Sequence, residues 1–117
     1  MITSASNLTP GQCLSMRLEA QAPICIGLDP VTSRLPESID GADEVAAIEQ
    51  FSRGVLDSVV GITPCVKVQA ACFERYGSRG VAAMERVITA AVDSGFLVIL
   101  DAKRGDIGIS AAHYAAG

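Results

Sequence analysis

The amino-acid sequence predicts an α/β protein built from parallel strands that alternate with helices. Three short apolar runs, at 24–28, 64–68 and 96–100, lack the polar alternation of a half-exposed strand and are too short for helices, so we expect buried strands. The segments between these runs carry apolar residues at helical spacing. Strands and helices that alternate in this way are typical of parallel β/α units joined by right-handed crossovers.

Residues with known capping preferences mark the helix boundaries. Thr9 is expected to cap a first short helix that begins at Pro10, and Gly61 lies just past the end of a second. Gly95 is expected to end a third helix, which follows Ser78. The apolar faces of the second and third helices comprise Val45, Ile48, Val55, Leu56 and Val59, and Val81, Met84, Val87, Ile88, Ala91 and Val92.

Three other segments complete the predicted elements. The polar stretch 31–41 contains Pro36 and is expected to be a loop, whereas Glu74 and Tyr76 are expected to fix the turn after the second strand. Residues 111–117 have helical character but reach no stop signal other than Gly117, so we expect the chain to end within an element.

Composition indicates a small domain and narrows the class of partner. Half of the 117 residues are hydrophobic, which is enough for one core, so we interpret residues 1–117 as a single domain. The formal net charge of −4 argues against a DNA or RNA polymer as partner, because such binding needs Lys and Arg concentrated on one face. A small anionic ligand held by a few local cations is compatible with this charge.

Cysteine and histidine usage shows no metal-site pattern. The cysteines are Cys13, Cys25, Cys65 and Cys72. They form no C-x-x-C pair, and His113 is the only histidine, so no structural metal is expected. Free cysteines that behave as small hydrophobes favour a reduced, cytoplasmic protein. The first ten residues lack a secretory pattern, and no apolar run approaches the roughly 18 residues of a membrane span, so we expect neither export nor membrane insertion.

Charged residues end or follow each predicted strand. Because the carboxyl ends of parallel strands meet at one edge of a sheet and ligands bind there, these side chains are candidates for a site. They are Asp29, Lys67, Asp101, Lys103 and Asp106. Asp101 and Lys103 are two residues apart, so they face the same way if the third strand continues that far.

Each candidate also has a structural interpretation. Asp29 precedes Pro30 and would also fit a simple turn, and Asp101 with Lys103 would also fit a structural ion pair. Lys67 is harder to explain in this way, because an unpaired ammonium inside an apolar strand costs several kcal/mol. His113, which stands among alanines, is expected to pack or to face solvent rather than to catalyse.

One string and two shorter segments together resemble a known family. Residues 101–108 read Asp-Ala-Lys-Arg-Gly-Asp-Ile-Gly, which resembles the D-x-K-x-x-D-I motif of orotidine 5'-monophosphate decarboxylases, in the form of their longer bacterial branch. The segments Gly-Leu-Asp-Pro at 27–30 and Val-Lys-Val-Gln at 66–69 agree with that family. The likeness extends from about Ile24 to Tyr114, nearly the whole chain but under half of a complete family member.

The resemblance implies a fold and an activity. The fold would be a partial (β/α)8 TIM barrel, namely the first three β/α units of its parallel sheet. The activity would be the decarboxylation of orotidine 5'-monophosphate to uridine 5'-monophosphate in pyrimidine biosynthesis, by a lyase that needs no cofactor and no metal. The whole enzyme would be a cytoplasmic homodimer, and this chain, as its N-terminal portion, would be inactive alone.

The resemblance also implies catalytic roles for three residues. Loss of CO2 leaves an anion at C6 of the pyrimidine, so the protein must place fixed positive charge beside that carbon. Lys103 would supply this charge and then donate its proton, with Asp101 near the departing carboxylate. Asp106 would reach into the neighbouring subunit's site. The flanking carboxylates would keep the lysine charged.

Four residues would contact the substrate according to the same resemblance. Asp29 and Lys67 would hold the ribose hydroxyls, and Ile107 and Ser110 would add contacts. The family usually has Thr where this chain has Ser110, which keeps the hydroxyl and loses the methyl group. The backbone amides and the arginine that grip the substrate phosphate in the family come from later strands.

Two alternatives stay open at the level of sequence. One is a Mg2+-dependent sugar-phosphate decarboxylase or aldolase of the same barrel group, whose members also show D-x-K-x-x-D after the third strand. The other is a non-catalytic fragment that acts by association through its open strand edges.

Overall fold

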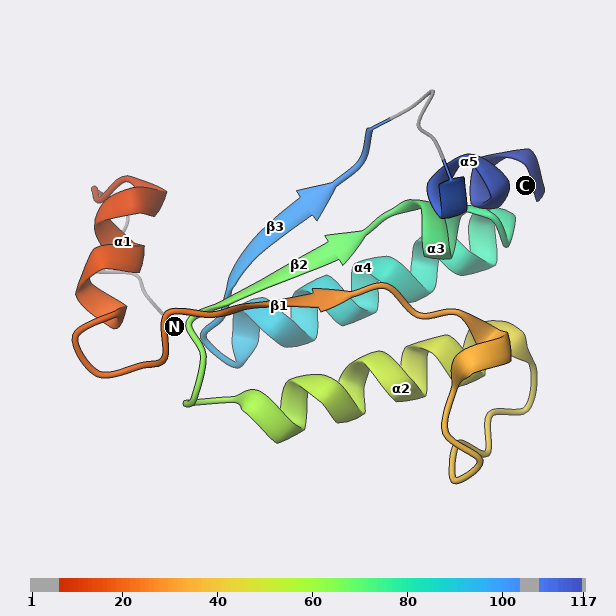
Figure 1. Ribbon diagram of the computed structural model, residues 1–117, viewed down its shortest axis with the longest axis horizontal. Helices are drawn as coiled ribbons and strands as arrows, with labels where there is room; N and C mark the ends of the chain where they lie inside the picture. Colours follow the sequence, from red (N-terminus) through yellow and green to blue (C-terminus); the bar gives the residue numbers. More distant parts are fainter. Residues whose placement is uncertain (1–6, 104–107, 117) are drawn as a thin grey trace.

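A three-stranded parallel sheet is the centre of the computed structural model, which describes residues 7–103 and 108–116. Its strands are β1 (Cys25–Leu28), β2 (Cys65–Gln69) and β3 (Leu97–Asp101), in that spatial order. All three point the same way (Figure 1), and the pairing is parallel throughout. The α/β class is therefore confirmed, and each strand lies within one residue of its predicted bounds.

Capping residues begin the first two helices. α1 (Pro10–Arg17) follows Thr9, whose hydroxyl accepts the backbone N–H of Gln12, while the Gln12 side chain accepts the N–H of Thr9. α2 (Glu44–Val59) follows Asp43, whose carboxylate accepts a backbone N–H of the first turn. These bonds satisfy N–H groups that have no partner inside the helix.

Glycine follows both long helices, as the sequence predicted. After α2, Gly61 adopts a φ of 77°, and after α4 (Gly77–Asp93), Gly95 adopts a φ of 93°. Both values lie in the left-handed region, which a residue with a Cβ enters at a cost. The chain can therefore reverse at these points and enter β2 and β3.

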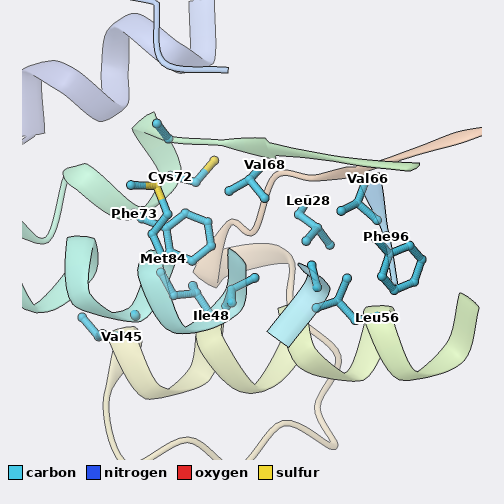
Figure 2. Close-up of a cluster of buried hydrophobic side chains, with 14 residues drawn as sticks. Leu28, Val45, Ile48, Leu56, Val66, Val68, Cys72, Phe73, Met84 and Phe96 are labelled. Carbon is cyan, nitrogen blue, oxygen red and sulfur yellow. The ribbon is translucent and has the colours of Figure 1, made fainter. Parts of the chain in front are cut away.

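The hydrophobic core lies between one face of the sheet and the two long helices, α2 and α4 (Figure 1). Figure 2 shows side chains from the strands meeting side chains from both helices and from the start of α3. The core includes Leu28, Val66 and Val68 from the sheet, Ile48 and Leu56 from α2, and Phe73, Met84 and Val87. Because strand side chains alternate, the residues between these positions point to the opposite face, which neither long helix covers.

Three helical segments differ from the sequence prediction. Residues expected to form only a turn after β2 instead form a short helix, α3 (Ala71–Glu74), whose first three residues are buried. Four residues are too few to show a helical apolar period, which is why the pattern missed it. The last helix, α5 (Gly108–Ala116), begins three residues before its predicted start, and a short 3-10 turn (Thr32–Arg34) lies within the predicted loop.

The small helices lie at opposite ends of the sheet. α1 stands by the amino ends of the strands, whereas α3 and α5 lie side by side at the carboxyl ends (Figure 1). Within residues 7–103 and 108–116, no helix has the length and apolar character required to cross a bilayer.

Two helical glycines provide a matched test of this packing. A Cβ at Gly80 of α4 would overlap the backbone carbonyl oxygen of Phe73, whereas a Cβ at Gly54 of α2 would meet nothing within 4 Å. We expect Gly80→Ala to lower the free energy of unfolding by about 1–3 kcal/mol, as overpacking does. Gly54→Ala should raise it by about 0.5–1 kcal/mol, because alanine favours helix. Urea denaturation of both variants measures these changes in the free energy of unfolding. Equal changes in the two variants would contradict the packing of α4 on α3.

Candidate active site

The strand register brings the charged residues to one face of the sheet. Val68 faces the buried core, so its neighbours Lys67 and Gln69 point to the opposite, uncovered face. Asp101 is the direct register partner of Gln69. Lys67 and Asp101 therefore share the face that the long helices leave open, close to the carboxyl ends of the strands.

Lys103 and Asp101 form an ion pair at this edge. The Lys103 ammonium donates to Asp101 Oδ2 at 2.6 Å, although β3 itself ends at Asp101. The side chain of Asp101 is only 16% exposed, whereas that of Lys103 is 51% exposed. The hydrogen bond from Lys103, assisted by the charge of Lys67, holds the pKa of Asp101 below its usual value of 3.8. The expectation that Asp101 and Lys103 face the same way depended on the third strand continuing to Lys103, which it does not, but the two side chains meet in the ion pair.

Asp29 lies directly after β1 and turns back over the same face. Its Oδ1 atom is 3.1 Å from the point that a Cβ of Gly27 would occupy. Gly27 is the register partner of Lys67. The Asp29 carboxylate is thus held over the strand next to Lys67, and it is exposed to solvent. A larger residue at position 27 would crowd this carboxylate.

Gln69, for which the sequence analysis predicted no role, also faces this side of the sheet. It is buried, and its Oε1 atom has no hydrogen-bond partner among the described residues. A buried amide oxygen that accepts no hydrogen bond costs free energy of folding. The position of Gln69 therefore favours a hydrogen-bond donor that comes from outside residues 7–103 and 108–116. The alternation of Lys67 and Gln69 in β2 was the available signal, since it places both on one face.

A second polar cluster joins α5 to α3 beside the same edge. The side chain of His113 is 2% exposed. Its Nδ1 atom lies 2.9 Å from a guanidinium nitrogen of Arg75, and its Nε2 atom lies 3.5 Å from the sulfur of Cys72. Arginine can only donate, so Nδ1 must accept and the proton of the neutral ring is on Nε2, facing the sulfur. Of the two structural alternatives expected for His113, packing or facing solvent, the structure shows packing, with partners that the sequence analysis did not predict.

Burial sets the charge state of this second cluster. Burial, together with the charge of Arg75, holds the pKa of His113 below its usual value of 6.5, although Asp29 opposes the shift. Burial also raises the pKa of the Cys72 thiol to about 12. At neutral pH, the His113 ring and the Cys72 thiol are therefore uncharged. Their contact holds α5 against α3, directly after the segment of the sequence that contains Asp101, Lys103 and Asp106.

Three of the predicted site residues are not placed at the level of their side chains. Asp106 and Ile107 lie outside the described residues, and Ser110 belongs to α5, with no described side chain. In the parts of the chain that are described, no three His, Cys, Asp or Glu side chains gather as ligands for a metal.

One hollow among residues 7–103 and 108–116 lies away from the charged cluster. It has a volume of about 500 Å3 and is lined by Arg17, Gln21, Thr63 and Gly95, at the amino ends of the strands. The charged residues instead lie on an open sheet face. Three strands cannot enclose such a face, whereas a barrel of eight strands does.

Comparison with known proteins identifies the family. The profile of the "Orotidine 5'-phosphate decarboxylase / HUMPS family" matches residues 22–117. The chain belongs to this family. The resemblance inferred from the sequence motifs is thereby confirmed, and the three parallel strands are those of a partial TIM barrel.

Relatives of this family cover most of the chain. An orotidine 5'-phosphate decarboxylase from Streptomyces coelicolor is 43% identical over 106 residues, which are 90% of this chain and 37% of that protein. The Rhodopirellula baltica enzyme of the same name is 43% identical over 98 residues, or 78% of this chain and 32% of that protein.

Solved structures agree with the sequence relatives. A candidate orotidine 5'-phosphate decarboxylase from Streptomyces avermitilis superposes with a TM-score of 0.71 at 43% identity, over 91% of this chain and 37% of that one. The OMP decarboxylase of Leishmania donovani superposes with a TM-score of 0.65 at 32% identity, over 92% of this chain and 38% of that one. The chain thus spans between 32% and 38% of the length of these four proteins.

The buried histidine predicts a pH dependence of stability. A pKa below 6.5 in the folded state means that the unfolded chain binds the proton more readily. The contribution of His113 is therefore fully present above pH 6.5 and is lost as the pH falls from 6.5 toward the folded-state pKa. Asp43, Glu49 and Asp101 also have lowered pKa values, but from usual values of 3.8 to 4.5, so they act in a more acidic range.

Chemical denaturation between pH 7.5 and about 5 checks this dependence. The free energy of unfolding should fall with pH in the wild-type chain and stay nearly flat in His113→Gln, which cannot gain a charge but can still accept from Arg75. Arg53→Gln, an exposed change on α2, serves as the control and should keep the wild-type slope. Parallel slopes for wild type and His113→Gln would contradict the burial of a neutral histidine.

Proposed function

We propose that the complete protein containing this chain converts orotidine 5'-monophosphate to uridine 5'-monophosphate and CO2, and that this chain supplies the proton donor. The observation that carries the proposal is the Lys103 ammonium held 2.6 Å from Asp101 at the carboxyl end of β3. The proposed substrate is taken from the family to which the chain belongs and from the names of the chain's relatives.

The proposed chemistry needs one ammonium group beside the reacting carbon. When the C6–carboxylate bond breaks, the electron pair stays on C6 and CO2 leaves. The positive charge of Lys103 stabilises this anion, and a proton then moves from Nζ to C6, so that the lysine becomes a neutral amine until solvent returns a proton. A charge fixed in place before the reaction stabilises the transition state without reorganisation.

Asp101 orients Lys103 and keeps it charged. A carboxylate with a lowered pKa is fully ionised at neutral pH, and its proximity favours the protonated form of the lysine. In the proposed complex, Asp101 also lies near the departing carboxylate. Asp106 would complete the alternation of charges from the neighbouring subunit of a cytoplasmic homodimer.

The remaining predicted residues are proposed to bind the substrate. Asp29 and Lys67 would hold the ribose hydroxyls, which fits their placement over neighbouring strands on the uncovered face. Ile107 and Ser110 would contact the substrate after the motif. Residues 1–117 would form the N-terminal portion of one barrel domain, and this portion alone is expected to be inactive, since the phosphate grip would come from later strands.

A second candidate activity follows from the breadth of the family description, which also covers the HUMPS group. A Mg2+-dependent sugar-phosphate decarboxylase or aldolase of the same barrel group would lose activity when a chelator removes the metal. The favoured function would survive chelation. Assay of the complete protein on orotidine 5'-monophosphate, with and without EDTA, separates the two candidates.

Substitution of Lys103 tests the proposed proton donor in the complete protein. We expect Lys103→Ala to lower kcat by at least about 10^4-fold, because both the fixed charge and the proton source are lost. Lys103→Arg keeps a positive charge but gives up its proton far less readily, so kcat should remain low. A non-reactive nucleotide analogue should still bind both variants.

Arg53→Ala is the matched control, since it removes one exposed cation from the outer side of α2. Its kcat should equal that of the wild type. An active Lys103→Ala enzyme, with kcat within tenfold of the control, would disprove the assignment of the proton donor.

A further inference from the structure

The short helix α3 holds the chain on both sides of the charged motif. Before the motif, the backbone N–H of Ala70, which precedes α3, donates to the carbonyl oxygen of Asp101 at 2.9 Å. After the motif, His113 of α5 contacts Cys72 in α3 and Arg75 directly after α3. α3 therefore links the last residue of β3 to the helix that follows the motif (Figure 1).

α3 is a firm support for these contacts. Its first three residues are completely buried, and Phe73 is part of the hydrophobic core. The backbone of α3 also lies so close to α4 that a Cβ at Gly80 would overlap the carbonyl oxygen of Phe73. Because close-packed interiors resist displacement, a side chain that is fixed on α3 fixes the helix that carries it.

The contacts of His113 are complete within the described residues. The side chain is 2% exposed with these residues alone, so further strands and helices of a barrel can only add to its burial. His113 stands three residues after Ser110 in α5, which is about one helical turn. The contacts of His113 therefore determine where the backbone of Ser110 and the start of α5 lie.

Protonation of the ring would remove the contact with Arg75. Nδ1 accepts a hydrogen bond from Arg75 only while the ring is neutral, because an imidazolium has two donors and no acceptor. Among the described residues, the charged groups that act on the ring are Arg75, which opposes its protonation, and Asp29, which favours it. Cys72 stays a neutral thiol beside Nε2, since burial raises its pKa to about 12. A protonated His113 would therefore face the cation of Arg75 with no acceptor between them.

We propose that His113 is a positioning residue for the decarboxylation, which holds α5 on α3 so that the substrate contacts next to Lys103 are in place, and that its protonation releases α5 and lowers turnover. This inference rests on the proposed function. His113 acts through α3 and α5 and not by contact with the reacting carbon.

Kinetics of the complete protein on orotidine 5'-monophosphate test the positioning role. His113→Ala loses the contact with Arg75, so kcat/KM at pH 7.5 should fall by about tenfold to a hundredfold, as misplacement on the order of 1 Å costs. His113→Gln keeps an acceptor for Arg75 and should retain most of the wild-type kcat/KM. Arg86→Gln is the matched control, because it removes a contact between α4 and Glu49 of α2, and it should leave kcat/KM unchanged.

The pH profile separates positioning from a merely structural role. The kcat/KM of the wild type, divided by that of His113→Gln, should fall as the pH decreases below 6.5, because only the histidine gains a charge. The ratio cancels the titration of the substrate phosphate, whose second pKa of about 6 affects both proteins equally. A ratio that does not change with pH would overturn the inference.

Hydrogen–deuterium exchange of the same proteins tests the contact between α3 and α5 without substrate. In His113→Ala at pH 7.5, amides of residues 108–116 should exchange faster than in the wild type, while those of α2 keep their rate and verify the fold. Equal exchange of residues 108–116 in the two proteins would overturn the inference, and so would an unchanged kcat/KM in His113→Ala. Wild-type protein that shows this exchange pattern but no decarboxylation would instead reject the proposed function, and the positioning role with it, while the contact between α3 and α5 would stand.

Discussion

The parallel register of β2 and β3 is the constraint on which the site depends. Val66 and Val68 are completely buried against α2 and α4, so the residues between and after them must face the other side. A slip of one residue would exchange the two faces and place Lys67 in the apolar core. The burial of two valines thus fixes the positions of the charges, and Asp101 follows through its pairing with Gln69.

The strength of the charged pair depends on what surrounds it. In this chain, the Lys103 side chain is half exposed, so water screens its attraction to Asp101, and such pairs contribute little to stability. The same pair acts far more strongly where water is excluded, because the interaction scales inversely with the local dielectric constant. Three strands bring the groups together, and in the proposed complete barrel, closure by further strands would supply the environment in which a fixed charge is effective. The chain spans about 37% of the length of its Streptomyces coelicolor relative, and its proposed function accordingly belongs to the complete barrel.

Local patterns account for the features that the sequence predicted well. Unbroken apolar runs located the three strands, and the glycines at 61 and 95 located the ends of the long helices. The edge where Asp101 and Lys103 meet also followed from sequence, since parallel strands carry their carboxyl ends together. The catalytic and binding roles of these residues stay predictions.

Local sequence patterns could not predict the features that depend on contacts between distant segments of the chain. The burial of His113 between Cys72 and Arg75 requires α5 to pack on α3, and α3 is too short to leave a periodic signal. Alternation in β2 shows which face Gln69 occupies, but its unpartnered amide oxygen is visible only when its neighbours are in place.

Titration of the Asp101 carboxyl group by carbon-detected NMR tests the central claim most directly, because the claim is a short-range contact between two named charges. The account predicts a pKa for Asp101 below 3.8 in the wild-type chain, with a shift back toward 3.8 in Lys103→Met and a smaller shift in the same direction in Lys67→Met. A wild-type pKa for Asp101 of 3.8 that neither substitution changes would contradict it.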